Sequence, residues 1–266
     1  MDLLKPEYET YQDVKNTLAW WAAPIWGIFA IVMFYVVLTP AHRQTVLVLV
    51  LLLGEIWGHA GAVTILIVLG AVFSYIAVHI LELHDHVYDQ YFVKWRRDYA
   101  RDQIVPALVT PYAESFPTRL LEVAKEDLRK TLNLIFYPFV GDRDTKIRKN
   151  LVVRFYERIT KYWLAQLAEI ACLLFITGVV LYCAAGFVVE WWAKGSGWTI
   201  SFLAFLTIVP ALLLFALVRI ISKRLRKAVW EATHEEILDI HSQCAEALQE
   251  ALKKLCMEYG IDEESP

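Results

Sequence analysis

The sequence predicts an all-α protein that crosses a membrane four or five times. Hydrophobic residues make up 58% of the 266-residue chain, and its mean hydropathy of +0.42 is well above that of an ordinary soluble domain. Several apolar runs approach the roughly 20 residues that a helix needs to cross a bilayer. We find neither the period-two alternation of strands nor an internal repeat. These features predict a polytopic helical membrane protein.

The chain is expected to begin with a polar segment, residues 1–17, followed by a transmembrane region, residues 18–83. The first 17 residues carry two lysines and four acids, so they lack the basic start of a signal peptide, and the first apolar run is expected to remain in the protein. That run spans Ala19–Leu38 and has tryptophans near its start, as membrane interfaces do. Pro40 ends it, because proline stops a helix.

A second apolar run, Thr45–Leu81, is too long for one simple crossing. Its 37 residues would form a helix of about 55 Å, against a hydrocarbon core of about 30 Å. The glycine-rich stretch around Glu55 and His59 is the expected break, which would give five crossings. A single long helix with part outside the lipid would give four. If the helix is continuous there, Glu55 and His59 share a face and could line an ion path; at a surface turn, both side chains would reach water.

The distribution of basic residues predicts which segments lie in the cytoplasm. The stretch Lys94–Lys161 has 15 Lys and Arg against 9 Asp and Glu, and Arg219–Lys227 has five basic residues and no acid. By the positive-inside rule, residues 84–161 and the C-terminus are expected to be cytoplasmic, in a multi-pass protein of the cell membrane. Residues 162–218 are expected to form a transmembrane hairpin. Within the cytoplasmic section, residues 115–137 predict one helix, and a basic helix is expected to run into the hairpin.

The tail, residues 219–266, is expected to contain one long amphipathic helix over Arg219–Tyr259. Its apolar residues recur at steps of four and three, which is typical of a coiled coil. The pattern fits a coiled coil between subunits and packing against the chain's own helices equally well. The seam contains Leu238, His241, Ala245, Leu248, Leu252, Leu255 and Tyr259.

A second candidate site is a stripe of imidazole and carboxylate side chains. His79, Glu82, His86 and Asp89 follow one another at steps of three, four and three, so on a helix they would share a face, and this mixture suits Zn²⁺, Fe²⁺ or Mn²⁺. One helix face rarely completes a metal site, so the tail would have to add ligands. A solvated face just outside the membrane is the plainer interpretation.

Two further groups of residues stand out near the membrane boundary. Gln166 and Glu169 lie one turn inside the hairpin, where they could line a vestibule or join two helices by a hydrogen bond. The basic cluster of the tail would lie among anionic lipid headgroups, and nucleic acid is a poorer match. This cluster contains Lys223, Arg224, Arg226 and Lys227.

The sequence narrows the function without identifying it. It carries no P-loop, no dinucleotide fingerprint and no zinc-protease or serine-hydrolase motif, so an enzyme is disfavoured but not excluded. The four cysteines lack metal-like spacing and are expected to be reduced. The first hypothesis is a homo-oligomeric channel gated by its cytoplasmic helices. The alternatives are a non-catalytic anchor or scaffold that docks a cytoplasmic partner and, less well supported, a membrane metalloenzyme.

Overall fold

The computed structural model describes residues 11–37, 64, 67–84, 98–117, 119–140, 147–194 and 198–261. These residues are helical apart from short turns, and none of them is in a strand, so the expected all-α class is confirmed. The chain divides into two compact units. Unit 1 is formed by residues 1–14, 87–160 and 225–266, and unit 2 by residues 15–86 and 161–224.

Unit 2 contains most of α1 (Tyr11–Val37) and the apolar helix Ile67–Ile80. The two helices approach each other closely because small residues face one another. A Cβ added to Gly70 would lie 2.1 Å from the carbonyl oxygen of Ala23, and the Ser74 hydroxyl donates to the carbonyl oxygen of Ala19 over 2.7 Å. Side chains of this size let helix backbones meet, as in membrane helix pairs.

The helix that begins at Ile67 loses its regular geometry before it ends. Its last turn is the π-helix η1 (Ile76–Ile80), and Glu82 has a φ of +43°, in the left-handed region that side chains other than glycine's adopt at a cost of about 1–2 kcal/mol per residue. Two further residues, His84 among them, continue in π geometry. A regular α-helical face therefore does not extend from His79 through Glu82.

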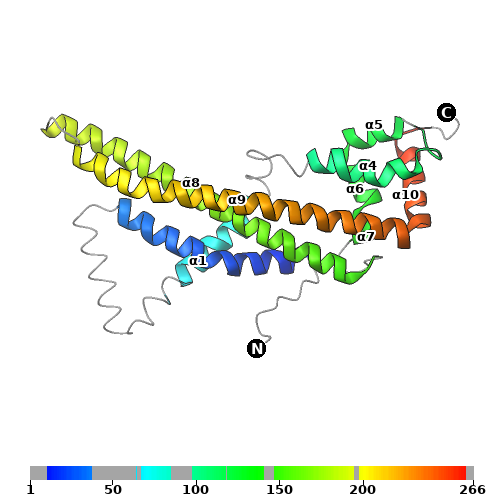
Figure 1. Ribbon diagram of the computed structural model, residues 1–266, viewed down its shortest axis with the longest axis horizontal. Coiled ribbons are helices and arrows are strands. Elements are labelled where there is room, and N and C mark those ends of the chain that lie inside the picture. Colours follow the sequence, from blue (N-terminus) through cyan, green and yellow to red (C-terminus); the bar gives the residue numbers. More distant parts are fainter. Residues whose placement is uncertain are drawn as a thin grey trace. The chain divides into compact units, whose positions relative to one another are not determined.

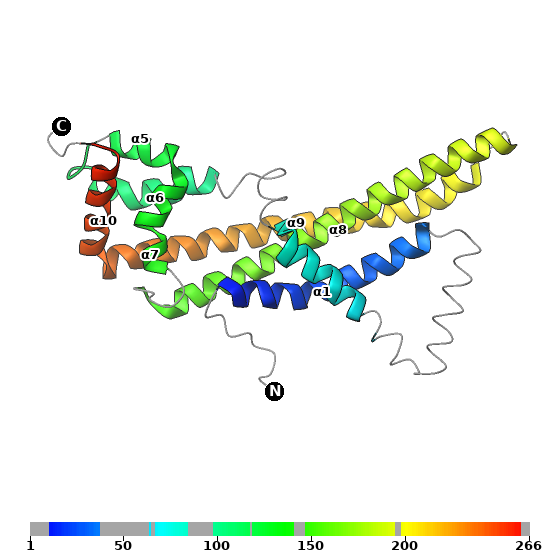
Figure 2. The same cartoon turned by 180° about the vertical axis from the view of Figure 1, so that it is seen from behind.

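The two longest helices contribute to both units. Helix α8 covers Lys149–Lys194 and α9 covers Trp198–Gln243, 46 residues each, and their parts in unit 2 lie side by side in both views (Figures 1 and 2). Within the described residues, one stretch is long and apolar enough to cross a membrane, Lys149–Ala185 in α8, while Ile67–Ile80 is apolar but shorter. The basic helix and the hairpin helix expected from the sequence are thus one continuous element.

Unit 1 packs several short helices beside its parts of α8 and α9 (Figure 1). Residues 98–112, which we call the 98–112 segment, run through η3 (Ala100–Ile104), α4 (Val105–Val109) and η4 (Thr110–Tyr112). The label η marks π- and 3₁₀-helices. This segment buries Val105 and Leu108 completely, so it belongs to the core of the unit.

The single helix expected over residues 115–137 is wrong. The structure has α5 (Arg119–Glu126), α6 (Leu128–Ile135) and the short α7 (Tyr137–Val140). Asp127 leaves helical geometry at φ −108° and ψ 68°, and its side chain accepts a hydrogen bond from the backbone nitrogen of Lys130. An aspartate offers this N-cap readily, and the apolar periodicity that suggested one helix does not register a cap.

The single long tail helix is also wrong. Helix α9 ends at Gln243, Cys244 adopts φ −128° and ψ 22°, and α10 (Ala245–Glu258) follows. Leu248, Leu252 and Leu255 are fully buried, and α10 packs on α6 of the same chain. Packing inside the chain therefore accounts for the seam, whereas Leu238, its first member, is exposed. No coiled-coil partner is needed to cover α10.

Candidate functional site

A buried ion pair joins the two long helices within unit 2. Nη1 of Arg219 in α9 lies 2.9 Å from Oε2 of Glu169 in α8, and the Glu169 side chain has no exposed surface. Oε1 of the same carboxylate has no hydrogen-bond partner among the described residues. A buried acid in an apolar segment costs free energy unless it is paired, so Arg219 explains how Glu169 is tolerated there.

Polar and aromatic side chains continue one turn away along α8. Nε2 of Gln166 donates to the hydroxyl oxygen of Tyr162 over 2.6 Å, and both side chains are buried. Trp163 is buried beside them and meets the ring of His84 edge to face, with ring centroids 4.6 Å apart. Gln166 and Glu169, which the sequence singled out, thus lie enclosed in helix contacts of the single chain.

The stripe proposed as a metal site is only half described. His79 lies tilted against the Tyr75 ring, and the Glu82 carboxylate forms an ion pair with Lys15 of α1. His86 and Asp89 lie outside the described residues, as do Glu55 and His59. No group of three or more potential metal ligands occurs within the described ranges. The metal set stays a prediction, which elemental analysis of purified protein can test.

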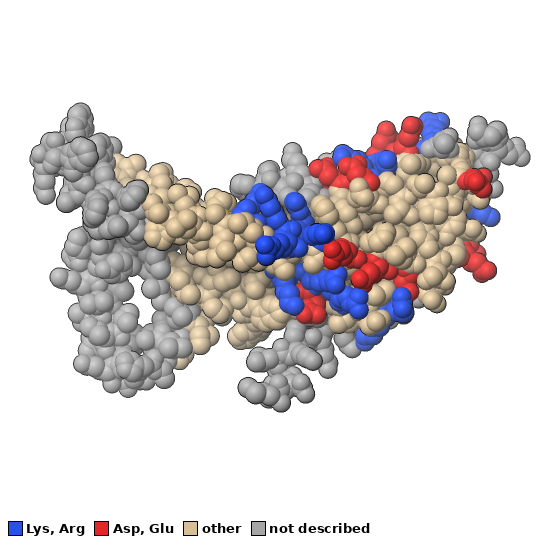
Figure 3. Space-filling view, viewed as in Figure 1, with Lys and Arg blue, Asp and Glu red and all other residues tan. Residues whose placement is uncertain are grey.

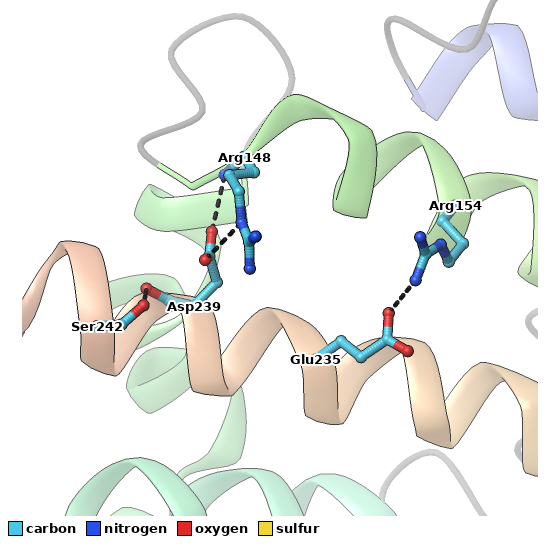
Figure 4. Close-up of polar contacts among 5 residues, drawn as sticks. All are labelled: Arg148, Arg154, Glu235, Asp239 and Ser242. Atoms are coloured by element: carbon cyan, nitrogen blue, oxygen red, sulfur yellow. Dashed lines mark hydrogen bonds and ion pairs between the residues drawn. The ribbon is translucent and has the colours of Figure 1, made fainter.

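Two ion pairs bind α9 to α8 and to Arg148, the residue just before α8, within unit 1 (Figure 4). The Arg148 backbone nitrogen and Nε both donate to the Asp239 carboxylate, over 2.9 and 2.8 Å, and the Asp239 side chain is completely buried. Two turns further into α8, Arg154 donates to Glu235. Because Asp239 accepts two hydrogen bonds, one of them from a cation, its charge is well compensated.

The basic cluster of the tail lies on one stretch of α9. Lys223, Arg224 and Lys227 are exposed and Arg226 is half-buried, and basic side chains gather near the middle of this helix in Figure 3. The Arg226 guanidinium carbon lies 5.3 Å from the centroid of the Trp230 ring, within the range of a cation–π contact. Lys227 stands 4.0 Å from Glu231, one turn later.

Several residues of these contacts were not identified from the sequence. Gly70 and Ser74 are four residues apart, as are Ala19, Ala23 and Gly27 of α1, and this spacing of small residues is a recognised packing signal in membrane helices. Among the partners, Lys15, His84 and Arg219 come from distant positions that no local pattern connects, whereas Tyr162 lies one turn from Gln166 on α8.

The comparisons with known proteins identify a family and nothing closer. No curated protein matches the chain, and no solved structure does either. The model of the YmfE protein family matches residues 16–249. This range contains α8 and α9 whole, α1 from its sixth residue onward, all of residues 84–161 and most of the tail. Because the match covers most of the chain, the protein belongs to the YmfE protein family.

Proposed function

We propose that the protein is an integral membrane anchor, with unit 2 embedded in lipid and unit 1 in the cytoplasm as a docking module for a partner protein. The observation that supports this most directly is the distribution of exposed apolar side chains. Among the described residues, every exposed large hydrophobic side chain except Tyr137, Leu238 and Met257 belongs to unit 2. A water-soluble surface rarely carries so many contiguous apolar groups, whereas lipid chains would cover them without cost.

The order of side chains along α9 supports the same assignment. Leu213, Leu217 and Ile221 are among the exposed apolar residues before the basic cluster, and the first acid of this helix, Glu231, follows it. A helix that leaves a membrane toward the cytoplasm passes first through hydrocarbon, then through anionic headgroups and then into water, which is the order of these side chains. The number of crossings, four or five, is part of the proposal.

The accessibility of introduced cysteines tests whether unit 2 is embedded in the membrane. In a variant whose four native cysteines are replaced by serine, Lys253→Cys should react with a membrane-impermeant maleimide in inside-out vesicles and stay unlabelled in sealed right-side-out ones. Leu213→Cys, on the exposed apolar stretch, should stay unlabelled in both preparations. Labelling of Leu213→Cys at the rate of Lys253→Cys, or release of the protein by an alkaline carbonate wash, would overturn the proposal.

The docking role has its own test. Crosslinking in native membranes, followed by purification, should recover one partner in fixed stoichiometry with the chain, and recovery should be lost when unit 1 surface residues are changed. A single-species homo-oligomer with measurable ion conductance would favour the second candidate instead.

That second candidate is a homo-oligomeric channel or pore, and Glu169 is the observation that favours it. A buried carboxylate whose Oε1 has no hydrogen-bond partner in the described part of the chain is the kind of group that lines ion or proton pathways in membranes. The channel requires that subunits assemble, because four or five crossings in one chain enclose little space. Gln166 and Glu169, which are buried in the single chain, would also have to become exposed to the path. Reconstituted protein should then conduct ions, and Glu169→Gln, Glu55→Gln and His59→Ala should change the flux. A wild-type protein without flux eliminates this candidate.

A further inference from the structure

One acid of unit 1 is buried without a counter-ion among the described residues. Glu236 lies in the middle of the buried face of α9 and exposes 1% of its surface. Its Oε1 has no hydrogen-bond partner among the described residues. Val229, Ala232, Thr233 and Ile240 belong to the same buried face, and these residues bring no charge to the carboxyl group.

The nearby cations are engaged by other acids. Arg148 binds Asp239 and Arg154 binds Glu235 (Figure 4). A further arginine, Arg158 of α8, donates to the carbonyl oxygen of Ala228 over 2.9 Å. No ion pair of Glu236 occurs in the part of the chain that the structure describes, so a negative charge there would have no cation of its own.

The 98–112 segment is attached to α9 on both sides of Glu236. At one end the Tyr99 ring stacks on Trp230, with centroids 5.1 Å apart and planes 3° from parallel, and its hydroxyl donates to the Trp230 carbonyl oxygen over 3.3 Å. At the other end Nε2 of His241 lies 2.9 Å from the carbonyl oxygen of Ala107, and the Tyr112 hydroxyl lies 3.4 Å from Nδ1 of the same ring. In sequence, Glu236 lies midway between these two attachments.

Protonation decides whether this arrangement is stable. Burial raises the pKa of the Glu236 carboxyl well above its ordinary value, and the nearby Glu235 carboxylate raises it further. Burial also raises the pKa of Tyr99 to about 12, and the charge that Glu236 carries at such alkaline pH adds to the effect. An uncompensated buried charge costs several kcal/mol, so ionisation of Glu236 favours any state in which water reaches it.

We propose that Glu236 is a proton-binding site of unit 1, and that loss of this proton to water releases the 98–112 segment from α9. The ionisable and charged groups considered with it are Tyr99 on the 98–112 segment, Glu235 and Asp239 on α9, Arg154 and Arg158 on α8, and Arg148 just before α8. His241 and Tyr112 form the far attachment. The inference concerns unit 1 alone and holds whether unit 2 anchors a partner or conducts ions.

Hydrogen exchange of the full-length protein in lipid nanodiscs tests the proposal. While the closed state keeps the proton and the open state has lost it, the opening equilibrium rises about tenfold per pH unit. After correction for the intrinsic pH dependence of exchange, protection of peptides from residues 98–112 should therefore fall by about that factor per unit as pH rises above the ordinary carboxyl pKa of 4.5, until the closed state also ionises. Peptides from α10 serve as an internal reference and should keep their protection.

Two variants distinguish the effect of Glu236 from that of the neighbouring Glu235. Glu236→Gln keeps the shape of the side chain and cannot ionise. In this variant the exchange protection of residues 98–112 should not depend on pH. Glu235→Gln removes one acid from the exposed side of the same turn and should retain the pH dependence. Wild-type protection that does not change with pH, or an equal fall in Glu236→Gln, overturns the proposal. If Glu236→Gln does not fold, the infrared band of the buried carboxylic acid decides. In the wild type the band should be present while the segment is closed and vanish as the segment opens, and its absence from the closed state refutes the site.

Discussion

The α-carbon of Gly70 presses against the backbone of Ala23, so closely that a methyl group on Gly70 would lie 2.1 Å from the Ala23 carbonyl oxygen and 3.1 Å from Cα of Gly27. Both neighbours are backbone atoms, which cannot turn away as a flexible side chain can. The nearby hydrogen bond from Ser74 to Ala19 depends on the same separation of the helices. Gly70 is thus a point of close backbone approach between α1 and the helix Ile67–Ile80.

Replacing Gly70 should therefore separate α1 from its neighbour. Gly70→Ala is expected to lower stability by about 1–3 kcal/mol, the usual cost of overpacking, and Gly70→Leu by more. The melting temperature in detergent, followed by circular dichroism, measures the effect. Val72→Leu, at an exposed position of the same helix, is the matched control and should melt like the wild type. A Gly70→Leu protein that is as stable as the wild type would show that the close approach is absent.

The ion pair between Arg219 and Glu169 predicts an asymmetric pair of variants. Arg219→Met leaves a fully buried carboxylate without its cation, whereas Glu169→Gln leaves an arginine that is partly exposed and can reach water or headgroups. Removing one partner of a buried pair can cost about 3 kcal/mol or more, so Arg219→Met should destabilise more than Glu169→Gln. The double variant should recover part of the loss in a double-mutant cycle. Equal, additive losses would contradict the pairing.

Glu236 predicts how the stability of unit 1 depends on pH. Its pKa is raised in the folded state above the ordinary 4.5, so as pH rises past that value the unfolded state ionises first and the folded state loses stability. The loss is about 1.4 kcal/mol per pH unit until the folded group also ionises. The melting temperature of the wild type should fall relative to Glu236→Gln between pH 5 and pH 8. Parallel melting curves for the two proteins over this range would count against the prediction.

The basic cluster predicts a dependence on anionic lipid. Changing Lys223, Arg224 and Lys227 together to glutamine should reduce the gain in melting temperature that anionic lipid gives over zwitterionic lipid in nanodiscs, because each basic group near a charged surface contributes about 1 kcal/mol. Lys253 and Lys254, which are exposed on α10, provide the matched control, and their removal should leave the lipid dependence intact. Equal effects of the two sets would refute a local headgroup contact.

Local patterns in the sequence predicted part of the fold well. The apolar runs and the lack of alternation were enough for the all-α class, because the period of apolar residues is a local property. The ends of helices were harder to predict. The breaks at Asp127 and Cys244 interrupt patterns that continue on both sides, and periodicity alone does not register a cap.

Part of the candidate site could likewise be predicted from the sequence, and part could not. Gln166 and Glu169 drew attention because polar groups in an apolar run are conspicuous, but their partners did not: Tyr162 lies one turn back along α8 and Arg219 on another helix. Glu236 was not noticed at all, since it lies among many charges in the tail. Its environment depends on which side of α9 faces the 98–112 segment.

The sequence by itself determined that the chain is helical and where its apolar and basic stretches lie, because composition and periodicity act over a few turns of one helix. The tertiary structure decided which small residues let α1 meet its neighbour, which arginine accompanies which acid, and which acid has no counter-ion. These depend on contacts between residues far apart in the chain. The cost of burying a charge is therefore set by packing, and packing made Asp239 a paired acid and left Glu236 without a cation.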